Sequence, residues 1–184
     1  MIYPIVAYGD PVLRKIGTPV SIDYPALKEV IANMFETMYE SQGVGLAAPQ
    51  IGKAINLFII DSSRFEDEKY PDVKKVFINA EIIEETGDKW DFEEGCLSIP
   101  HIRENVKRHS KLTIKYQDEN FENKEETYDG IVARIIQHEY DHIKGILFVD
   151  RLSELKKRLI KNKLINISKG AVNVDYKMKF PQTR

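Results

Sequence analysis

The segment IIQHEYDHIKG places two histidines four positions apart, His138 and His142, with Glu139 directly after the first. On an α-helix this spacing puts both imidazoles on one face, about one turn apart. In the HExxH arrangement the two histidines bind a divalent metal, and the carboxylate beside them handles protons. The segment therefore predicts a helix that carries two metal ligands.

The residues before the histidines favour metal binding over an incidental pair on a surface helix. Ile131 and Ile135 precede His138 and His142 at helical spacing, so one stripe is apolar at one end and metal-binding at the other. A pair of surface histidines needs no such apolar stripe, and the pattern indicates a metal site beside a core.

Two histidines leave such a site incomplete, because a hydrolytic metal usually has three protein ligands and one open position. The candidates for the third ligand are Cys96, His101 and His109 upstream, and Asp150 and Glu154 downstream. The residues favour Cys96, the single cysteine, which follows Glu94 and Gly95. A thiolate binds borderline and soft divalent metals well. The alternative is that this lone cysteine is a small hydrophobic residue buried in the core.

Length and composition bound the kind of protein. The 184 residues suit one domain, and with 42% hydrophobic and 30% charged residues a globular chain is expected, not a disordered one. No apolar run approaches the roughly 20 residues that span a bilayer, and the first residues lack the pattern of a signal peptide. We therefore expect a single domain over residues 1–184, no membrane association and a cytoplasmic location.

Charge is unevenly distributed along the chain. Residues 151–184 carry ten Lys/Arg and two acidic residues, a net charge of +8, whereas residues 1–150 carry a net charge of −10. A basic tail on an acidic body indicates an anionic partner, and the alternative is a solvated helix face.

Periodicity predicts an α+β fold, with mixed or antiparallel sheets around a central metal-binding helix. The expected helices are an N-terminal one at 25–42, the central one from Asp129 to about Lys144, and a C-terminal one at 153–168. The expected strands are 55–61, 76–85, 111–118, 121–128 and 172–180, with a polar loop at 62–75 and a turn at TGDK, residues 86–89.

Three segments together resemble the peptide deformylase family. They are GVGLAAPQ at 43–50, EGCLS at 94–98 and QHEYDH at 137–142, in the family's order and at similar separations. The opening YGDPVLRK also resembles the family's N-terminal segment. The likeness runs from about Pro4 to Ser153.

The resemblance implies an enzyme that removes the N-terminal formyl group from formyl-methionyl ends of new chains and releases formate. It implies as metal ligands Cys96, His138 and His142, with water in the fourth position. Glu139 is then the general acid/base, and Gln50 and the backbone N–H of Leu97 face the oxyanion. The family usually employs one ferrous ion, and Zn²⁺, Ni²⁺ or Co²⁺ can replace it in such a donor set.

The family pattern also implies a substrate site. The methionine pocket is lined by Val44, Phe92, Ile131, Arg134, Ile135 and part of His138. Gly45 lets a strand-like edge lie against the substrate backbone, and Gly95 allows a close backbone approach beside the cysteine. Arg103 lies near the substrate chain or forms a surface salt bridge. Arg134 departs from the more usual apolar residue, and its head is expected to reach water.

Two other functions are compatible with HExxH. A small metalloprotease needs a downstream third ligand, and no histidine follows His142. A metal-stapled binding protein on the ribosome needs four protein ligands, for instance with His101 as the fourth. In some deformylases a basic C-terminal helix docks on the ribosome, so the resemblance also implies that partner for the basic region.

Overall fold

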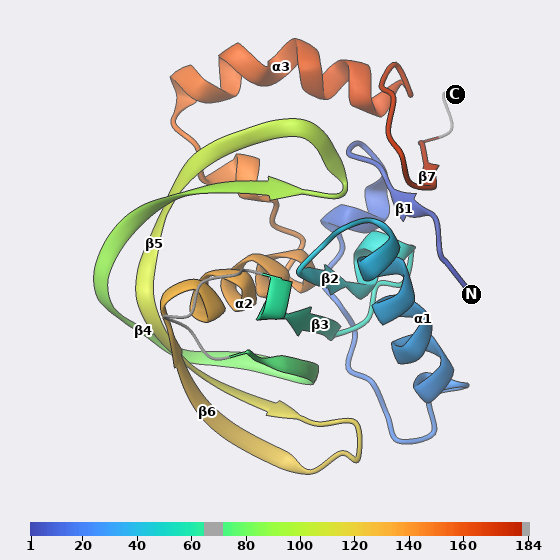
Figure 1. Ribbon diagram of the computed structural model, residues 1–184, viewed down its shortest axis with the longest axis vertical. Helices are drawn as coiled ribbons and strands as arrows, with labels where there is room; N and C mark the ends of the chain where they lie inside the picture. The colour runs from blue at the N-terminus through green and yellow to red at the C-terminus, as the bar shows by residue number, and fades with distance from the viewer. Residues whose placement is uncertain (65–71, 182–184) are drawn as a thin grey trace.

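A five-stranded antiparallel sheet curves around one helix, in the computed structural model that describes residues 1–64 and 72–181 (Figure 1). The strand order is β2-β3-β4-β5-β6. The strands are β2 Gly45–Ala47, β3 Leu57–Asp61, β4 Lys74–Cys96, β5 Ile99–Gln117 and β6 Asn123–Asp129. The enclosed helix is α2, Gly130–Ile143, as the α+β prediction requires.

The central helix follows from the apolar spacing of its first turns. Ile131 and Ile135 are both buried, and α2 lies within the curve of β4 and β5 (Figure 1). Gly145 follows the helix with φ at +72°, and a Cβ there would lie 2.6 Å from the carbonyl oxygen of Arg14. A glycine is therefore required where the chain leaves α2 and packs on the N-terminal segment.

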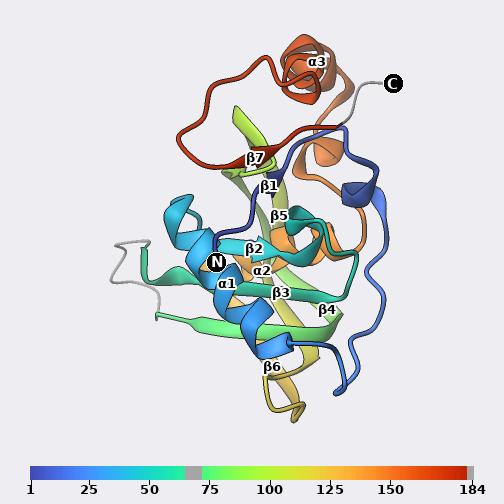
Figure 2. The ribbon, with the colours of Figure 1, turned by 90° about the vertical axis from the view of Figure 1, so that its right-hand side faces the viewer.

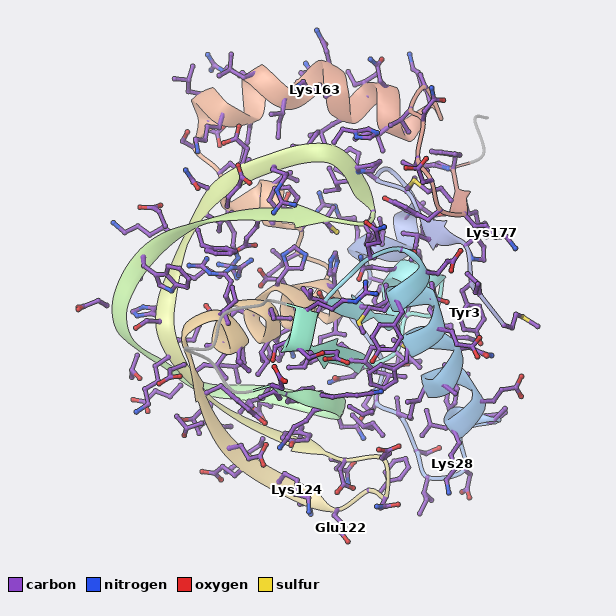
Figure 3. The ribbon with its side chains drawn as sticks, in the orientation of Figure 1. Tyr3, Lys28, Glu122, Lys124, Lys163 and Lys177 are labelled. Atoms are coloured by element: carbon purple, nitrogen blue, oxygen red, sulfur yellow. The ribbon has the colours of Figure 1, made fainter. Side chains whose placement is uncertain are left out.

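The two outer helices are also confirmed, with shorter bounds for α1. Helix α1 spans Leu27–Glu40 and packs its apolar stripe into the core, whereas α3 spans Glu154–Ser168 and buries Ile160 and Ile167. The Ser153 side chain accepts a hydrogen bond from the first turn of α3, as expected for an N-cap. Helix α3 crosses the edge of the molecule, where Lys163 is exposed to solvent (Figure 3).

The predicted turn at TGDK, residues 86–89, is wrong, because β4 runs through it. The β4–β5 register shifts between Thr86 and Lys89, and Lys89 pairs with His109. Gly87 takes a φ of +74° there. A β-bulge absorbs the turn-forming residues without ending the strand, since the partner strand continues to pair on both sides.

The predicted loop at 62–75 is described only in part. Residues 65–71 lie outside the described residues, residues Ser62–Arg64 form one 3-10 turn, and β4 begins at Lys74. The predicted hairpin around Glu119 and Asn120 is confirmed as the β5–β6 connection.

The two ends of the chain meet in a second, two-stranded sheet. Strand β1, Ile5–Val6, pairs in parallel with β7, Met178–Lys179. Figure 2 shows the C-terminal segment passing from α3 to β7 beside β1. Of the predicted final strand at 172–180, this short piece is regular strand. In the described part of the chain, no helix is both long and apolar enough to cross a membrane.

Candidate metal centre and substrate cleft

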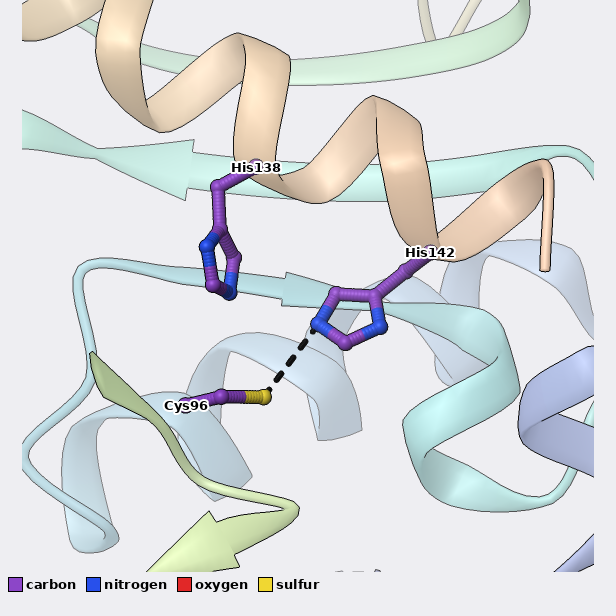
Figure 4. Close-up of side chains that lie close together, drawn as sticks. All are labelled: Cys96, His138 and His142. Carbon is purple, nitrogen blue, oxygen red and sulfur yellow. Dashed lines mark hydrogen bonds between the residues drawn. The ribbon is translucent and has the colours of Figure 1, made fainter. Parts of the chain in front are cut away.

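The end of strand β4 meets the middle of α2 at a cluster of three potential metal ligands. His138 and His142 project from α2 towards Cys96 (Figure 4). The ligand atoms of these three residues lie within 4.8 Å of one another, and Cys96 Sγ lies 3.3 Å from His142 Nε2. A thiol and two imidazoles form a donor set that suits a borderline divalent metal.

The other candidates for the third ligand are engaged elsewhere. His101 is exposed, and its Nε2 lies 2.6 Å from the carbonyl oxygen of Asn173, to which it donates. His109 contacts a backbone carbonyl across the β4–β5 ladder, and Asp150 and Glu154 form exposed ion pairs. Of the five candidates, Cys96 is the one that joins the two histidines.

Glu94 orients His138 from the side opposite the cluster. Its Oε2 lies 3.0 Å from His138 Nδ1, so a proton on Nδ1 leaves Nε2 free for a metal. Arg108 donates to both carboxylate oxygens of Glu94, at 2.7 and 3.0 Å. Burial acts to raise the pKa of Glu94, but the hydrogen bonds from His138 and Arg108 outweigh it and hold the pKa well below its usual range.

Sequence reasoning gave no role to Glu94, to Arg108 or to Asp141, which accepts from Arg108 at 2.7 Å. Their proximity in sequence to the predicted ligands could have indicated the two acids, since Glu94 stands two residues before Cys96 and Asp141 stands directly before His142. Ligating histidines usually have such a partner, which makes an acid beside each motif a reasonable candidate.

The prediction that the head of Arg134 reaches water is wrong. Its side chain is 2% exposed, and Nη1 donates to Glu94 Oε1 at 2.9 Å and to the Val106 carbonyl at 3.0 Å. Nη2 donates to the Trp90 carbonyl, and the guanidinium lies 4.7 Å from the centre of the Trp90 ring. These acceptors and the ring replace water around the charge, so the cleft is closed at this wall.

Glu139 is buried, and its Oε2 has no hydrogen-bond partner among the described residues. Gly45 lies against it, because a Cβ on Gly45 would fall 2.5 Å from Glu139 Oε1. Burial raises the pKa of Glu139 to about 7. A carboxyl group with this proton affinity can accept and release a proton near neutral pH.

Gln50 places its amide beside the cysteine. Its Oε1 accepts from the Ala47 N–H at 2.9 Å, which turns Nε2 towards Cys96 Sγ at 3.4 Å and Ser98 Oγ at 3.3 Å. Leu97 follows the cysteine directly, and its carbonyl accepts the hydroxyl of Tyr176 at 2.7 Å. The amide of Gln50 and the backbone of Leu97 thus flank the cluster.

A cleft of about 620 Å³ opens beside the cluster, and it brings the predicted substrate residues together. Its lining includes Val44, Gly45, Phe92, Gly95, Arg103, Ile131, Arg134 and Ile135. Arg103 also forms an exposed ion pair with Glu93 at 2.8 Å, so it lies at the rim.

The lining also includes residues 173–176, which sequence reasoning did not place at the site. The alternation of VNVDYKMKF predicted a strand there but gave no partner for it. Within this segment only Met178 and Lys179 form a strand, paired with β1 from the far end of the chain, and residues 173–176 lead into it without strand pairing.

Comparison with known proteins gives one consistent family. Residues 2–158 match the family described as Polypeptide deformylase. The chain is 58% identical to the peptide deformylase of Christiangramia forsetii over 193 aligned positions, which cover 100% of this chain and 98% of that protein.

Solved structures agree. The fold is similar to the peptide deformylase of Legionella pneumophila, with a TM-score of 0.82 and 40% identity over 95% of this chain and 100% of that one. It is also similar to the class I type b peptide deformylase of Acinetobacter baumannii with Met-Ala-Ser bound, with a TM-score of 0.77 and 36% identity over 83% of this chain and 99% of that one.

Proposed function

The chain belongs to the polypeptide deformylase family, and we propose that Cys96, His138 and His142 hold the metal on which this family depends. It is a metal-dependent hydrolase that removes the formyl group from formyl-methionyl peptides. The observation that carries the assignment of ligands is the convergence of their donor atoms within 4.8 Å, beside a buried Glu139.

When bound by these three residues, the metal would act as a Lewis acid and would lower the pKa of water so that it becomes a nucleophile near neutral pH. Glu139 takes a proton from the water that attacks the formyl carbon, and delivers it to the methionyl nitrogen as the C–N bond breaks. The products are formate and a free amino terminus. Its burial against Gly45 and its unpartnered Oε2 support this role.

Gln50 and Leu97 stabilise the charge that develops on the formyl oxygen. The Gln50 amide donates from Nε2, and the Leu97 backbone donates its N–H beside the cysteine. Both are held in place before the substrate arrives: Gln50 by its hydrogen bond from the Ala47 N–H, and Leu97 by the pairing of Cys96 with Ile99 on either side of it. Donors fixed in advance cost no reorganisation during the reaction.

The substrate backbone lies along Val44 and Gly45, and the methionine side chain enters the apolar part of the cleft. That part is lined by Val44, Phe92, Ile131 and Ile135, with the buried Arg134 closing one wall. Gly95 and Arg103 lie along the rest of the peptide. An unbranched thioether side chain fills such an irregular pocket well.

The pocket is tested by comparing formyl-Met-Ala-Ser with formyl-Ala-Ala-Ser. Burial of a methionine side chain is worth on the order of 1.5–3 kcal/mol, so the alanine peptide should be roughly tenfold to a hundredfold poorer in kcat/KM. Equal efficiencies for the two peptides would contradict the assigned pocket.

We propose Fe²⁺ as the metal in the cell, with Zn²⁺, Ni²⁺ or Co²⁺ able to replace it. Protein purified without oxygen should then contain about one iron per chain and lose activity in air, because a ferrous thiolate site is open to oxidation. Protein loaded with nickel should keep its activity in air. Air-stable activity of the iron form would contradict the assignment.

We also propose that the basic region at 151–184 docks on the ribosome in the cytoplasm, where formyl-methionyl chains emerge. Helix α3 supports this, because it buries little of its surface and exposes Arg158, Lys161 and Lys163. Binding through phosphates weakens steeply with salt. Reversal of these three charges to Glu should abolish co-sedimentation with ribosomes. The same reversal at three exposed lysines outside this region should not, and this control set is Lys28, Lys89 and Lys111. Unchanged co-sedimentation would contradict the docking proposal and indicate that the basic face of α3 is only solvated.

A further inference from the structure

The chain does not end with α3 but continues as an extended C-terminal strap, residues 171–180. The family match ends at residue 158, so the strap lies beyond it. Half-buried side chains alternate along it with exposed ones; the half-buried set is Val172, Val174, Tyr176, Met178 and Phe180. This alternation is typical of an extended segment packed on one side.

The strap is attached to the body at both ends. The N–H groups of Ile5 and Ala7 donate to its carbonyls at 2.8 Å, which forms the β1–β7 pair (Figure 2). His101 Nε2 donates to the Asn173 carbonyl at 2.6 Å. The backbone of the strap is thus held at both ends, and its side chains Val172, Met178 and Phe180 also pack on the core.

Between these attachments the strap forms a wall of the cleft. Residues 173–176 line it together with Leu97. Tyr176 and Leu97 pack on the core cluster around α1, whereas Val44 and Phe92 pack on the cluster around α2. The strap therefore lies at the end of the cleft away from the methionine pocket.

Tyr176 connects this wall to the reaction centre. Its hydroxyl donates to the Leu97 carbonyl at 2.7 Å, and Leu97 directly follows Cys96. Only two rotatable bonds separate the N–H of Leu97 from its carbonyl, and Cys96 before it pairs with Ile99 after it, so anchoring the carbonyl narrows the directions open to the N–H. A small misplacement of such a donor is costly to the reaction.

We propose that the strap recognises the residues that follow methionine in the substrate, and that Tyr176 is a positioning residue for the Leu97 N–H. This inference rests on the proposed function of the cleft. The strap adds residues 173–176 to the lining of the cleft that Val44 and Gly45 also line, so an extended peptide along that edge has a second surface to contact.

The hydroxyl of Tyr176 is tested by Tyr176→Phe, which keeps the ring. We expect kcat for formyl-Met-Ala-Ser to fall about threefold to tenfold with KM within twofold, since one neutral hydrogen bond is worth about 0.5–1.5 kcal/mol. The control is Tyr24→Phe, which removes a tyrosine hydroxyl outside the cleft. If the hydroxyl had only a structural role, Tyr176→Phe would lower the melting temperature without lowering kcat at an unchanged KM.

The wall is tested by truncation after Gly170, with two ligands that differ in length. Wild type should prefer formyl-Met-Ala-Ser to formyl-Met, and truncation should reduce this preference about tenfold. Binding of the product Met-Ala-Ser, measured by calorimetry on metal-loaded protein, should weaken to a similar degree. If the truncated chain does not fold, Val174→Asp in the full chain tests the same wall.

The two proposals fail in different ways. Wild type that binds Met-Ala-Ser but releases no formate refutes the activity, and binding then still reports on the strap. The strap inference is refuted if the wild type is active but Tyr176→Phe and the folded variants of the wall behave like it. In that case kcat, KM, peptide preference and product binding would all be unchanged.

Discussion

The side chain of Glu139 packs directly against the backbone of Gly45, because a methyl group on the glycine would lie 2.5 Å from the Oε1 atom of the carboxylate. Strand β2 approaches α2 this closely because position 45 has no side chain. The glycine of the motif is therefore explained by the position of the proposed general base as well as by the substrate edge.

Gly45→Ala should displace Glu139 and lower kcat by at least ~10², the usual scale of general acid–base catalysis. The metal should remain, because the ligands are not touched. Gly43→Ala is the milder change in the same motif, since its Cβ would come no nearer than 3.0 Å to another group, the end of the Leu97 side chain. Equal rates for Gly45→Ala and wild type would contradict the assigned position of the carboxylate.

Cys96 should be protected from alkylation while metal is bound, because a coordinated thiolate is not free to react. The rate of reaction with a thiol reagent should rise after chelation. Since Cys96 is the single cysteine of the chain, the label reports this site alone. The same rate of alkylation with and without chelator would contradict metal binding by Cys96 and indicate that it only packs in the core.

Arg134→Met should destabilise the fold by about 1.5–3 kcal/mol, the range for hydrogen bonds to charged groups. Glu94 keeps Arg108 as a partner, which limits the loss. Arg103→Met is the control, because its pair with Glu93 is exposed and worth roughly 0–1 kcal/mol. Urea unfolding of both variants measures the difference, and equal losses would contradict the buried role of Arg134.

Glu126 predicts a component of acid sensitivity. Burial acts to raise its pKa, but the hydrogen bonds from Lys75, Tyr116 and Tyr128 outweigh it and lower the pKa to about 2. A depressed folded pKa contributes stability above the unfolded value of 4.5, and that contribution is lost as pH falls towards 2. Glu126→Gln should be less stable than wild type at pH 7, and the two stabilities should converge over that range. Parallel urea midpoints from pH 7 to pH 2 would contradict this.

Local patterns predicted the helices well. Apolar spacing and the cap at Ser153 are contained within each segment, and the structure confirms all three helices. The TGDK prediction failed because β4 continues through those residues by pairing with β5, and pairing depends on residues distant in sequence. The same reason hid the partner of the final strand, since β1 and β7 come from opposite ends of the chain.

The site was predictable in its motifs and less so in its environment. The residues alone favoured Cys96 over His101 and the other candidates by a modest margin, and the resemblance to a family selected Cys96. The burial of Arg134 depends on Glu94, which is 40 positions away, and no helical pattern encodes that contact. The strap at 171–180 was expected as a strand but not as a wall of the cleft.

We propose that a metal-loaded cluster of Cys96, His138 and His142 hydrolyses formyl peptides with Glu139 as the proton carrier. The most direct measurement is formate release from formyl-Met-Ala-Ser by metal-loaded wild type and Glu139→Gln, with acetyl-Met-Ala-Ser as the control substrate. The extra methyl group of the acetyl peptide crowds the attacked carbon, so its cleavage should be far slower.

Wild type should release formate, and Glu139→Gln should keep one metal per chain while its rate falls by at least ~10². Loss of the metal from Glu139→Gln would show that the carboxylate is a ligand instead of a proton carrier. Release of internal fragments with the formyl group intact, or no turnover by fully loaded wild type, would contradict the account as a whole.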